Sequence, residues 1–135
     1  MSGRIAPSLA DPSIADIEWL ANKALAAIPR PFRRQLGGVT IRVEDFPDEP
    51  ARRAMGLHSP FDLLGLYRGV ALPYKSISDP TPHMDMIFLY RRPMLEYCCQ
   101  TGEDLADLVR HVLIHEIGHH FGFSDADMAR IEASG

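Results

Sequence analysis

The sequence predicts an α+β fold, in which a small mixed or antiparallel sheet of three to four strands packs against an N-terminal helix and a longer helix near the C-terminus. Apolar residues recur at helical spacing near both ends of the chain, and three short segments between them have the pattern of strands. The 135 residues, 46% of them hydrophobic and 24% charged, suit one globular core. We therefore expect residues 1–135 to form a single domain.

The first predicted helix covers residues 12–28. Asp11 is a candidate N-cap, and Pro12 suits the first helical position. Apolar side chains then recur at helical spacing at Ile14, Ile17, Leu20, Ala21, Ala24, Leu25 and Ile28. Pro29 and Pro31 are expected to interrupt the helix.

The first predicted strand contains Val39, Ile41 and Val43, which alternate with polar residues as in a half-buried strand. Residues 45–50 are acidic and contain proline, which predicts a loop. One short helical turn is expected within residues 51–64.

Two further strands are expected, over residues 65–72 and 84–90. Residues 73–82 between them are rich in serine, aspartate and proline, which predicts a loop. The third strand is followed by a turn region that leads to the long helix.

The long helix is predicted over residues 102–121, with Thr101 and Asp104 as a capping pair. Its apolar face is formed by Leu105, Leu108, Val109, Val112, Leu113 and Ile117. Ser124 and Asp127 have the spacing of a second capping pair, which predicts a short final helix.

A candidate metal site lies at the end of the long helix. His115 and His119 are four residues apart, so both imidazoles can reach one Zn²⁺, while Glu116 points toward the open coordination position. Glu116 would then act as the general base on a metal-activated water. The spacing predicts one zinc ion per chain and a hydrolase.

The third metal ligand is predicted to be Asp125. Gly122 can adopt a positive φ and end the helix, and that turn can bring Asp125 back toward the metal. A second interpretation remains open, because an acidic residue in the first turn of a helix is favoured by the helix dipole without any metal. Asp127 is the alternative third ligand.

The run His115-Glu116-Ile117-Gly118-His119-His120-Phe121-Gly122, with Asp125 beyond it, resembles the metzincin peptidase signature with aspartate in place of the third histidine. Over roughly residues 37–130 the chain more closely resembles the small bacterial minimal zincins, also described as zincin-like or matrix-metalloprotease-like metallopeptidases. Residues 63–69 and 87–93 contribute to this resemblance. The chain departs from the larger metzincins, which have a methionine-bearing turn after the metal ligands. Its sole methionine in that region is Met128.

The resemblance implies a zincin-like fold and a zinc-dependent metallopeptidase that hydrolyses peptide bonds. The substrate would be a peptide or a flexible protein segment bound in an extended conformation. The small size of the chain predicts a shallow cleft, which makes a protein that presents the substrate a candidate partner. The strand over residues 84–90 is the nearest candidate for the sheet edge that pairs with the substrate. Two alternatives remain: a zinc-stabilised binding or regulatory module with little or no peptidase activity, and a zinc hydrolase of a non-peptide amide.

Several other residues are candidates for the cleft. His120 points about 100° away from His119, which suits a group behind the ligands, a cleft wall or a surface histidine. Helix packing or solvent exposure is expected for His111, and no role is assigned to the loop histidines His58 and His83. A hydrogen-bond donor for the oxyanion could come from Tyr67, Tyr90 or Arg91.

Composition argues against several other classes of protein. A net charge of −4 argues against nucleic acid or an anionic membrane as a partner, and no apolar segment approaches membrane-spanning length. The start of the chain lacks the pattern of a signal peptide, and the adjacent Cys98 and Cys99 cannot join distant segments by a disulfide. We therefore expect a cytoplasmic location, with the cysteines packed near the start of the long helix.

Overall fold

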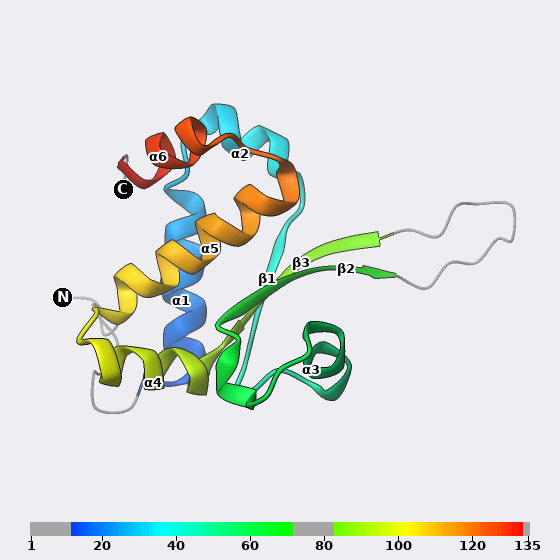
Figure 1. Cartoon of the computed structure of the whole chain (residues 1–135). Helices are drawn as coiled ribbons and strands as arrows, with labels where there is room; N and C mark the ends of the chain where they lie inside the picture. The colour runs from blue at the N-terminus through cyan, green and yellow to red at the C-terminus, as the bar shows by residue number, and fades with distance from the viewer. Residues whose placement is uncertain (1–11, 72–82, 134–135) are drawn as a thin grey trace, which may run out of the picture.

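The computed structural model describes residues 12–71 and 83–133, and its mixture of helices with a small sheet confirms the predicted α+β class (Figure 1). The helices are α1 (Ile14–Ala26), α2 (Arg30–Leu36), α3 (Glu49–Met55), a 3₁₀ turn η1 (Pro60–Asp62), α4 (Arg91–Thr101), α5 (Leu105–Phe121) and α6 (Asp125–Ala133). The strands are β1 (Thr40–Glu44), β2 (Gly65–Ala71) and β3 (His83–Tyr90). The predicted loop over residues 73–82 lies outside the described residues.

The sheet is mixed, with the strand order β1-β3-β2. β1 runs parallel to β3, with Ile41 opposite Ile87, whereas β2 runs antiparallel to β3, with Tyr67 also opposite Ile87. β3 is therefore the central strand, and the expectation that residues 84–90 form the edge beside the cleft is wrong. The edge strand that contacts α5 is β2.

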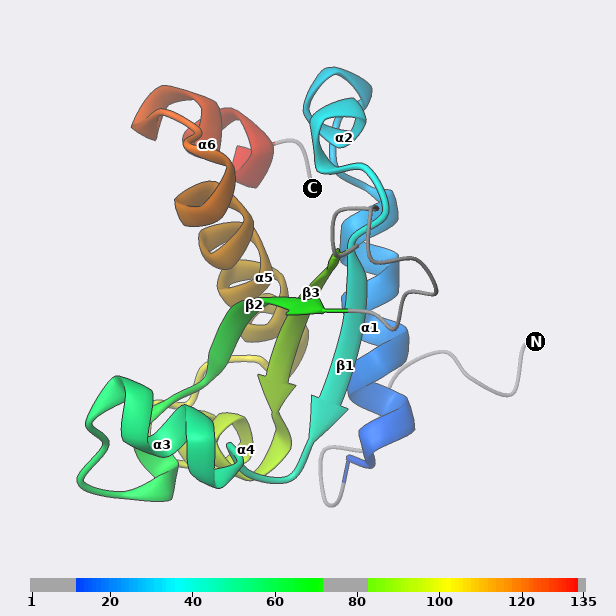
Figure 2. The ribbon, with the colours of Figure 1, turned by 90° about the vertical axis from the view of Figure 1, so that its right-hand side faces the viewer.

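The core lies between the sheet and two helices, as predicted. α1 and α5 pack against each other, and in Figure 2 both run behind the strands. Because β3 is central, Ile87, Phe88, Leu89 and Tyr90 are all buried in succession, without the alternation of a half-exposed strand. α5 contributes the largest buried set to this core, namely Leu105, Leu108, Val109, Val112, Leu113, Ile114 and Ile117.

The start of α1 differs from the prediction by two residues. Ser13 is the N-cap, and its hydroxyl accepts a hydrogen bond from the Asp16 N–H while the Asp16 carboxylate accepts one from the Ser13 N–H. This capping box satisfies two amides that the first turn leaves free. Pro12 lies outside the helix, and Asp11 lies outside the described residues.

The sequence does not predict α2 or α4. α3 begins inside the predicted loop over residues 45–50 and is longer than the single helical turn that was expected. Pro29 and Pro31 do interrupt the first helix, since α1 ends at Ala26, and they also stand at the start of α2, where proline suits the first turn. α4 follows β3 directly and has no side-chain cap at its start. It ends at Gly102, which has φ 77°, so α5 begins only at Leu105, capped by Asp104 rather than by the predicted Thr101–Asp104 pair.

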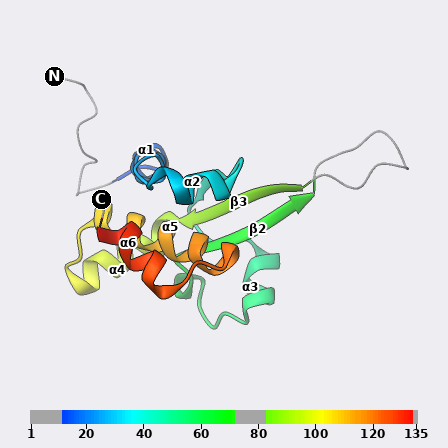
Figure 3. The same ribbon diagram turned by 90° about the horizontal axis from the view of Figure 1, so that it is seen from above.

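α2 and α6 lie at one end of the molecule, and α3 and α4 lie at the other (Figures 1 and 2). Figure 3 shows α2 and α6 from above. The ring of Phe32 on α2 stands 5.4 Å from the ring of Phe123, just before α6, and 5.6 Å from the guanidinium of Arg130 on α6. None of the described helices is long and apolar enough to cross a membrane.

Candidate active site

The candidate site is built on two neighbouring rows of side chains along α5. One row contains His111, His115 and His119, and the other contains Val112, Glu116 and His120. Residues four apart lie on the same side of a helix, one turn apart. The histidine row and the row that contains Glu116 therefore face neighbouring directions on α5.

In the histidine row, the rings of His115 and His119 are 6.3 Å apart between centroids. The ring of His111 lies closer, 4.1 Å from that of His115. The Nδ1 atom of His111 is 3.4 Å from Oε2 of Glu132 on α6, which ties this exposed histidine to the last helix. The structure therefore places the two predicted ligands side by side and adds His111 and Glu132 next to them.

Protonation of His115 suits a metal ligand. Burial lowers the pKa of His115, and the neighbouring charges of His111 and His119 lower it further, while that of Glu132 opposes them. A lowered pKa keeps the imidazole neutral near pH 7, which is the form that binds metal ions. The chemistry of the His115 and His119 donors thus fits zinc.

The other row of α5 contacts the edge strand β2. The Tyr67 N–H donates a hydrogen bond of 3.0 Å to Oε1 of Glu116, across 49 residues of chain. Burial raises the pKa of the Glu116 carboxyl, and the bond from Tyr67 acts in the opposite direction because it stabilises the carboxylate. A partly buried carboxylate with a raised pKa is a suitable proton acceptor, as a general base requires.

Tyr67 is also held through its side chain. Its ring lies nearly parallel to that of His120, with centroids 3.4 Å apart and an interplanar angle of 19°. Its hydroxyl donates to Oδ1 of Asp85 on β3. Burial and this bond to Asp85 raise the pKa of Tyr67 to about 12, so the phenol remains protonated.

The other two candidates for oxyanion stabilisation are a buried tyrosine and an arginine that is hydrogen-bonded to other residues. Tyr90 is fully buried, and among the described residues its hydroxyl has no hydrogen-bond partner. The guanidinium of Arg91 donates to the backbone oxygen of Pro12 at 2.6 Å and to Oδ1 of Asp45 at 3.0 Å. Neither side chain is linked to the two histidines by any of these contacts.

The turn after α5 follows the sequence prediction. Gly122 has φ 71° and ends the helix, and the Phe123 N–H donates to the Gly118 oxygen at 3.1 Å. Ser124 caps α6 by accepting a hydrogen bond of 3.0 Å from the Asp127 N–H. Asp125 is therefore the first residue of α6 and is exposed.

The two acidic candidates for third ligand differ in their contacts. Asp127 is engaged in the cap with Ser124 and in an ion pair with Arg130 at 2.6 Å, and these bonds lower its pKa. No hydrogen bond or ion pair within residues 12–71 and 83–133 involves the Asp125 carboxylate. Over the same residues, no three His, Cys, Asp or Glu side chains are grouped so that they could hold a metal ion. The structure therefore brings His115 and His119 together but does not bring Asp125 to them.

α6 packs back along α5 toward the start of that helix. Met128 lies against Gly118, where a Cβ would stand 2.5 Å from its Sδ atom. Farther along, Arg110 Nη2 donates to the backbone oxygens of Ile131, at 2.8 Å, and Glu132. Met128 is thus part of a helix, as the sequence predicts, and contacts α5 at the level of the two histidines.

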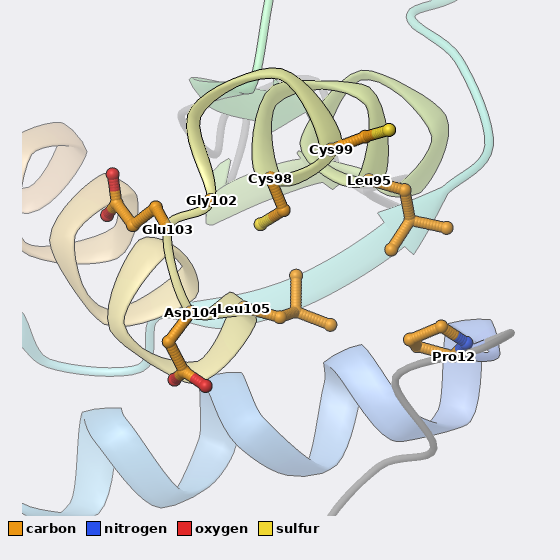
Figure 4. Close-up of a pocket in the computed structure, with 8 residues that line it drawn as sticks. All are labelled: Pro12, Leu95, Cys98, Cys99, Gly102, Glu103, Asp104 and Leu105. Atoms are coloured by element: carbon orange, nitrogen blue, oxygen red, sulfur yellow. The ribbon is translucent and has the colours of Figure 1, made fainter.

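A cavity of about 540 Å³ lies away from the histidine row. It is lined by residues of α4, the start of α5 and Pro12, and Cys98 points into it while Cys99 points away (Figure 4). Both cysteines are free, and burial raises the pKa of Cys98, so this thiol is less reactive than an exposed one. The expected packing of the pair near the start of the long helix is confirmed at Cys98, which lies against the core.

Gly65 and Asp85 lie beside the site but were not among the residues predicted from the sequence. Gly65 interrupts an apolar segment, and a glycine inside a strand can mark a close approach of another backbone or side chain, which was the available signal. Asp85, by contrast, had no signal, because its role depends on which strand pairs with β3. His58 is exposed, whereas His83, which was expected in a loop, is the first residue of β3, and nothing is described of its side chain.

Comparison with known proteins agrees with this geometry. The model of a protein family described as zincin-like metallopeptidase matches residues 36–134, well over half of the 135 residues. The matched region includes the whole sheet, α5 and α6, and leaves α1 outside it. No curated protein matches the chain. By the family match, the chain belongs to the zincin-like metallopeptidases.

Proposed function

We propose that this chain is a zinc-dependent peptidase with one zinc ion per chain, held by His115, His119 and Asp125, and with Glu116 as the general base. The observation that supports it most is the position of Glu116. This carboxylate is adjacent to the candidate ligands in sequence and is bonded to the backbone of an edge strand, 3.0 Å from the Tyr67 nitrogen. A purely structural zinc site has no use for such a base.

The edge of β2 suits an extended peptide. The Tyr90 N–H donates to the Leu64 oxygen at 3.0 Å, and in an antiparallel pair the residues bonded to the partner strand alternate with residues that face away from it. Gly65, Tyr67 and Gly69 therefore direct their backbone groups away from β3. A peptide or a flexible protein segment could pair with this edge and place its carbonyl carbon beside Glu116.

Glu116 and the metal ligands would then have different roles in hydrolysis. A bound zinc ion would activate a water molecule and polarise the scissile carbonyl. Glu116 would take the proton from that water and deliver it to the leaving amine. The neutral imidazoles of His115 and His119, with one carboxylate, would keep the ligand set at a single negative charge.

For the third ligand, the contacts of the two aspartates favour Asp125. Asp127 already caps α6 and pairs with Arg130, whereas Asp125 is exposed at the end of α6 nearest His119. The turn at Gly122 would have to rotate to bring Asp125 to the histidines. Asp127 is therefore the matched control for Asp125.

We also propose a partner protein and a location in the cell for the enzyme. Glu116 lines neither the cavity of about 540 Å³ nor the one of about 350 Å³, and we propose that a partner protein presents the substrate. A cytoplasmic location is also part of the proposal, because the free Cys98 and Cys99 suit a reducing compartment.

The test compares four proteins purified without added metal: wild type, Glu116→Ala, Asp125→Ala and Asp127→Ala. Zinc content is measured by elemental analysis, and cleavage is measured with a peptide library. We expect one zinc per chain in wild type, Glu116→Ala and Asp127→Ala, loss of zinc in Asp125→Ala, and loss of cleavage in Glu116→Ala.

Other outcomes would favour the alternatives. Zinc binding with equal behaviour of wild type and Glu116→Ala in every assay would favour a regulatory module. Zinc-dependent hydrolysis of small amides but of no peptide would favour a non-peptide hydrolase. An absence of zinc from the wild type, even after incubation with the metal, would contradict the proposal.

A further inference from the structure

Tyr67 connects three groups of the candidate site. Its backbone N–H donates to Glu116 Oε1 at 3.0 Å, its ring stacks on His120 with centroids 3.4 Å apart, and its hydroxyl donates to Asp85. The backbone atom that contacts the proposed base therefore belongs to a residue whose side chain is fixed from two sides.

His120 is on the side of α5 that contacts β2. Val112, Glu116 and His120 follow one another at intervals of one turn, and each contacts β2: Val112 at Gly65, Glu116 at the Tyr67 N–H, and His120 at the Tyr67 ring. His115 and His119 belong to the neighbouring row. His120 is thus placed to act on the strand.

We propose that His120 is a positioning residue for Glu116, and that it acts through Tyr67. The stack on His120 fixes the Tyr67 ring on the α5 side, and the bond to Asp85 fixes its other end on β3. Together they hold the Tyr67 N–H at the place where it fixes one oxygen of Glu116, which leaves the other oxygen free to accept a proton. This inference rests on the proposed function, since it assigns Glu116 the role of base.

Loss of the imidazole ring would remove one of the two contacts. The Tyr67 side chain could then turn about its bond to Asp85, and β2 could move relative to α5. Glu116 would lose its fixed orientation, and a misplacement of about 1 Å in a catalytic group costs up to about a hundredfold in rate. The zinc ligands would not be affected, because they lie on the other row.

The test uses the full chain and four variants. His120→Ala removes the ring, His120→Phe keeps a flat ring without the imidazole nitrogens, and Tyr67→Phe removes only the bond to Asp85. His58→Ala is the control, because His58 is an exposed histidine outside the site. For each protein, zinc content, kcat and KM for a cleaved peptide are measured, together with the ¹⁵N–¹H chemical shift of the Tyr67 amide in zinc-free protein.

We expect His120→Ala to lower kcat at least about tenfold while KM changes less than about twofold, since the loss concerns chemistry rather than binding. Zinc content should remain at one per chain. His120→Phe should recover most of kcat, and Tyr67→Phe should give an intermediate value. In zinc-free His120→Ala, the Tyr67 amide resonance should move toward its position in Glu116→Ala, which lacks the acceptor of this bond.

The inference would be overturned if His120→Ala kept both the wild-type kcat and the wild-type Tyr67 amide shift. It would also be overturned if His120→Phe were as impaired as His120→Ala, because the imidazole would then have a chemical role of its own. If wild type binds no zinc or cleaves nothing, the proposed function fails. The amide shift still decides whether His120 controls the bond from Tyr67 to Glu116.

Discussion

Gly65 on β2 lies so close to Val112 on α5 that a Cβ atom on residue 65 would stand 2.7 Å from Val112 Cγ1. The same atom would be 3.1 Å from the backbone oxygen of Phe88. Neither neighbour can move easily, because Val112 is branched at Cβ and Phe88 O belongs to the central strand. The absence of a side chain at residue 65 is therefore what allows β2 to approach α5 at the site where Tyr67 meets Glu116.

Gly65→Ala should destabilise the protein by about 1–3 kcal/mol, the usual cost of an added methyl group in a packed core. It should also lower peptidase activity, because β2 would move away from Glu116. Urea unfolding and peptide cleavage measure the two effects. Gly69→Ala is the control on the same strand, since a Cβ at Gly69 would meet nothing within 4 Å.

A second substitution tests whether the contact with Val112 causes the loss of stability. Gly65→Ala should cost less stability in a Val112→Ala background than in the wild type, because that background lacks the atom that the new methyl group meets. Equal stability of Gly65→Ala and Gly69→Ala would show that the contact with Val112 does not matter.

Arg110 joins the two helices of the site, because its guanidinium donates to the backbone oxygens of Ile131 and Glu132 at the end of α6. A cation at a helix C-terminus is favoured by the helix dipole. We expect Arg110→Ala to cost about 1.5–3 kcal/mol, the range for hydrogen bonds to a charged group. The free energy of unfolding in urea measures it.

The zinc affinity should fall in the same variant, because α6 carries Asp125. Arg53→Ala is the control, since Arg53 forms an exposed pair with Glu49 at 3.4 Å, for which a change below about 1 kcal/mol is expected. A normal zinc affinity in Arg110→Ala, measured by competition with a chelator, would mean that the position of α6 does not affect the site.

Much of the fold could be predicted because its elements have local signals. α1 and α5 have continuous apolar faces, α6 has the Ser124–Asp127 cap, and the strands have suitable composition. α4 has no such signal: it begins without a side-chain cap and contains Pro93. Pro29 and Pro31 separate α1 from the next helix, as predicted, but the sequence gives no further signal that α2 begins at these prolines.

In the candidate site, too, some relations between residues are local in the sequence and others depend on the whole fold. The interval between His115 and His119 fixes their relation on one helix, whatever the rest of the chain does. The partners of Glu116 and His120 depend instead on Tyr67, which is about 50 residues away, and on the position of β2 at the sheet edge. Strand order follows from packing of the whole domain, and β3 was accordingly taken for the edge strand.

Asp48 should make stability depend on pH in the acid range. It caps α3 by accepting a bond of 2.9 Å from the Ala51 N–H, and it pairs with Arg68 at 3.2 Å. The bond from Ala51 and the charge of Arg68 lower the pKa of Asp48 below 3.8. A lowered carboxyl pKa means that the stabilisation is present above the unfolded value and is lost as pH falls through the folded value.

Asp48→Asn keeps an oxygen for the cap and loses the charge, whereas Asp48→Ala loses both. Asp48→Ala should cost about 1 kcal/mol at neutral pH, as for other N-caps. Wild type and Asp48→Asn should differ most above about pH 4 and converge as the wild-type carboxyl is protonated. Parallel stability curves for these two proteins between pH 3 and pH 5, measured by thermal unfolding, would show that the Asp48 charge does not stabilise the fold.

Removal of metal should lower the thermal stability of the wild type, because an ion that binds only the folded chain shifts the equilibrium toward it. At a free zinc concentration of a hundred times Kd, the stabilisation is about 2.7 kcal/mol. For a chain of this size that corresponds to a shift in Tm on the order of 10 °C. Differential scanning calorimetry with zinc and with a chelator measures it.

The response of single variants to the chelator distinguishes residues that bind the metal from residues that only lie beside it. His115→Ala should unfold at the same temperature with and without chelator, because it lacks a ligand. Glu116→Gln should keep the full response, since this side chain is proposed to act on water rather than to bind the metal, and its amide oxygen can still accept the bond from Tyr67. Asp125→Ala should resemble His115→Ala if Asp125 is the third ligand. If the chelator response of Asp125→Ala is intact and that of Asp127→Ala is lost, the assignment of these two carboxylates must be exchanged.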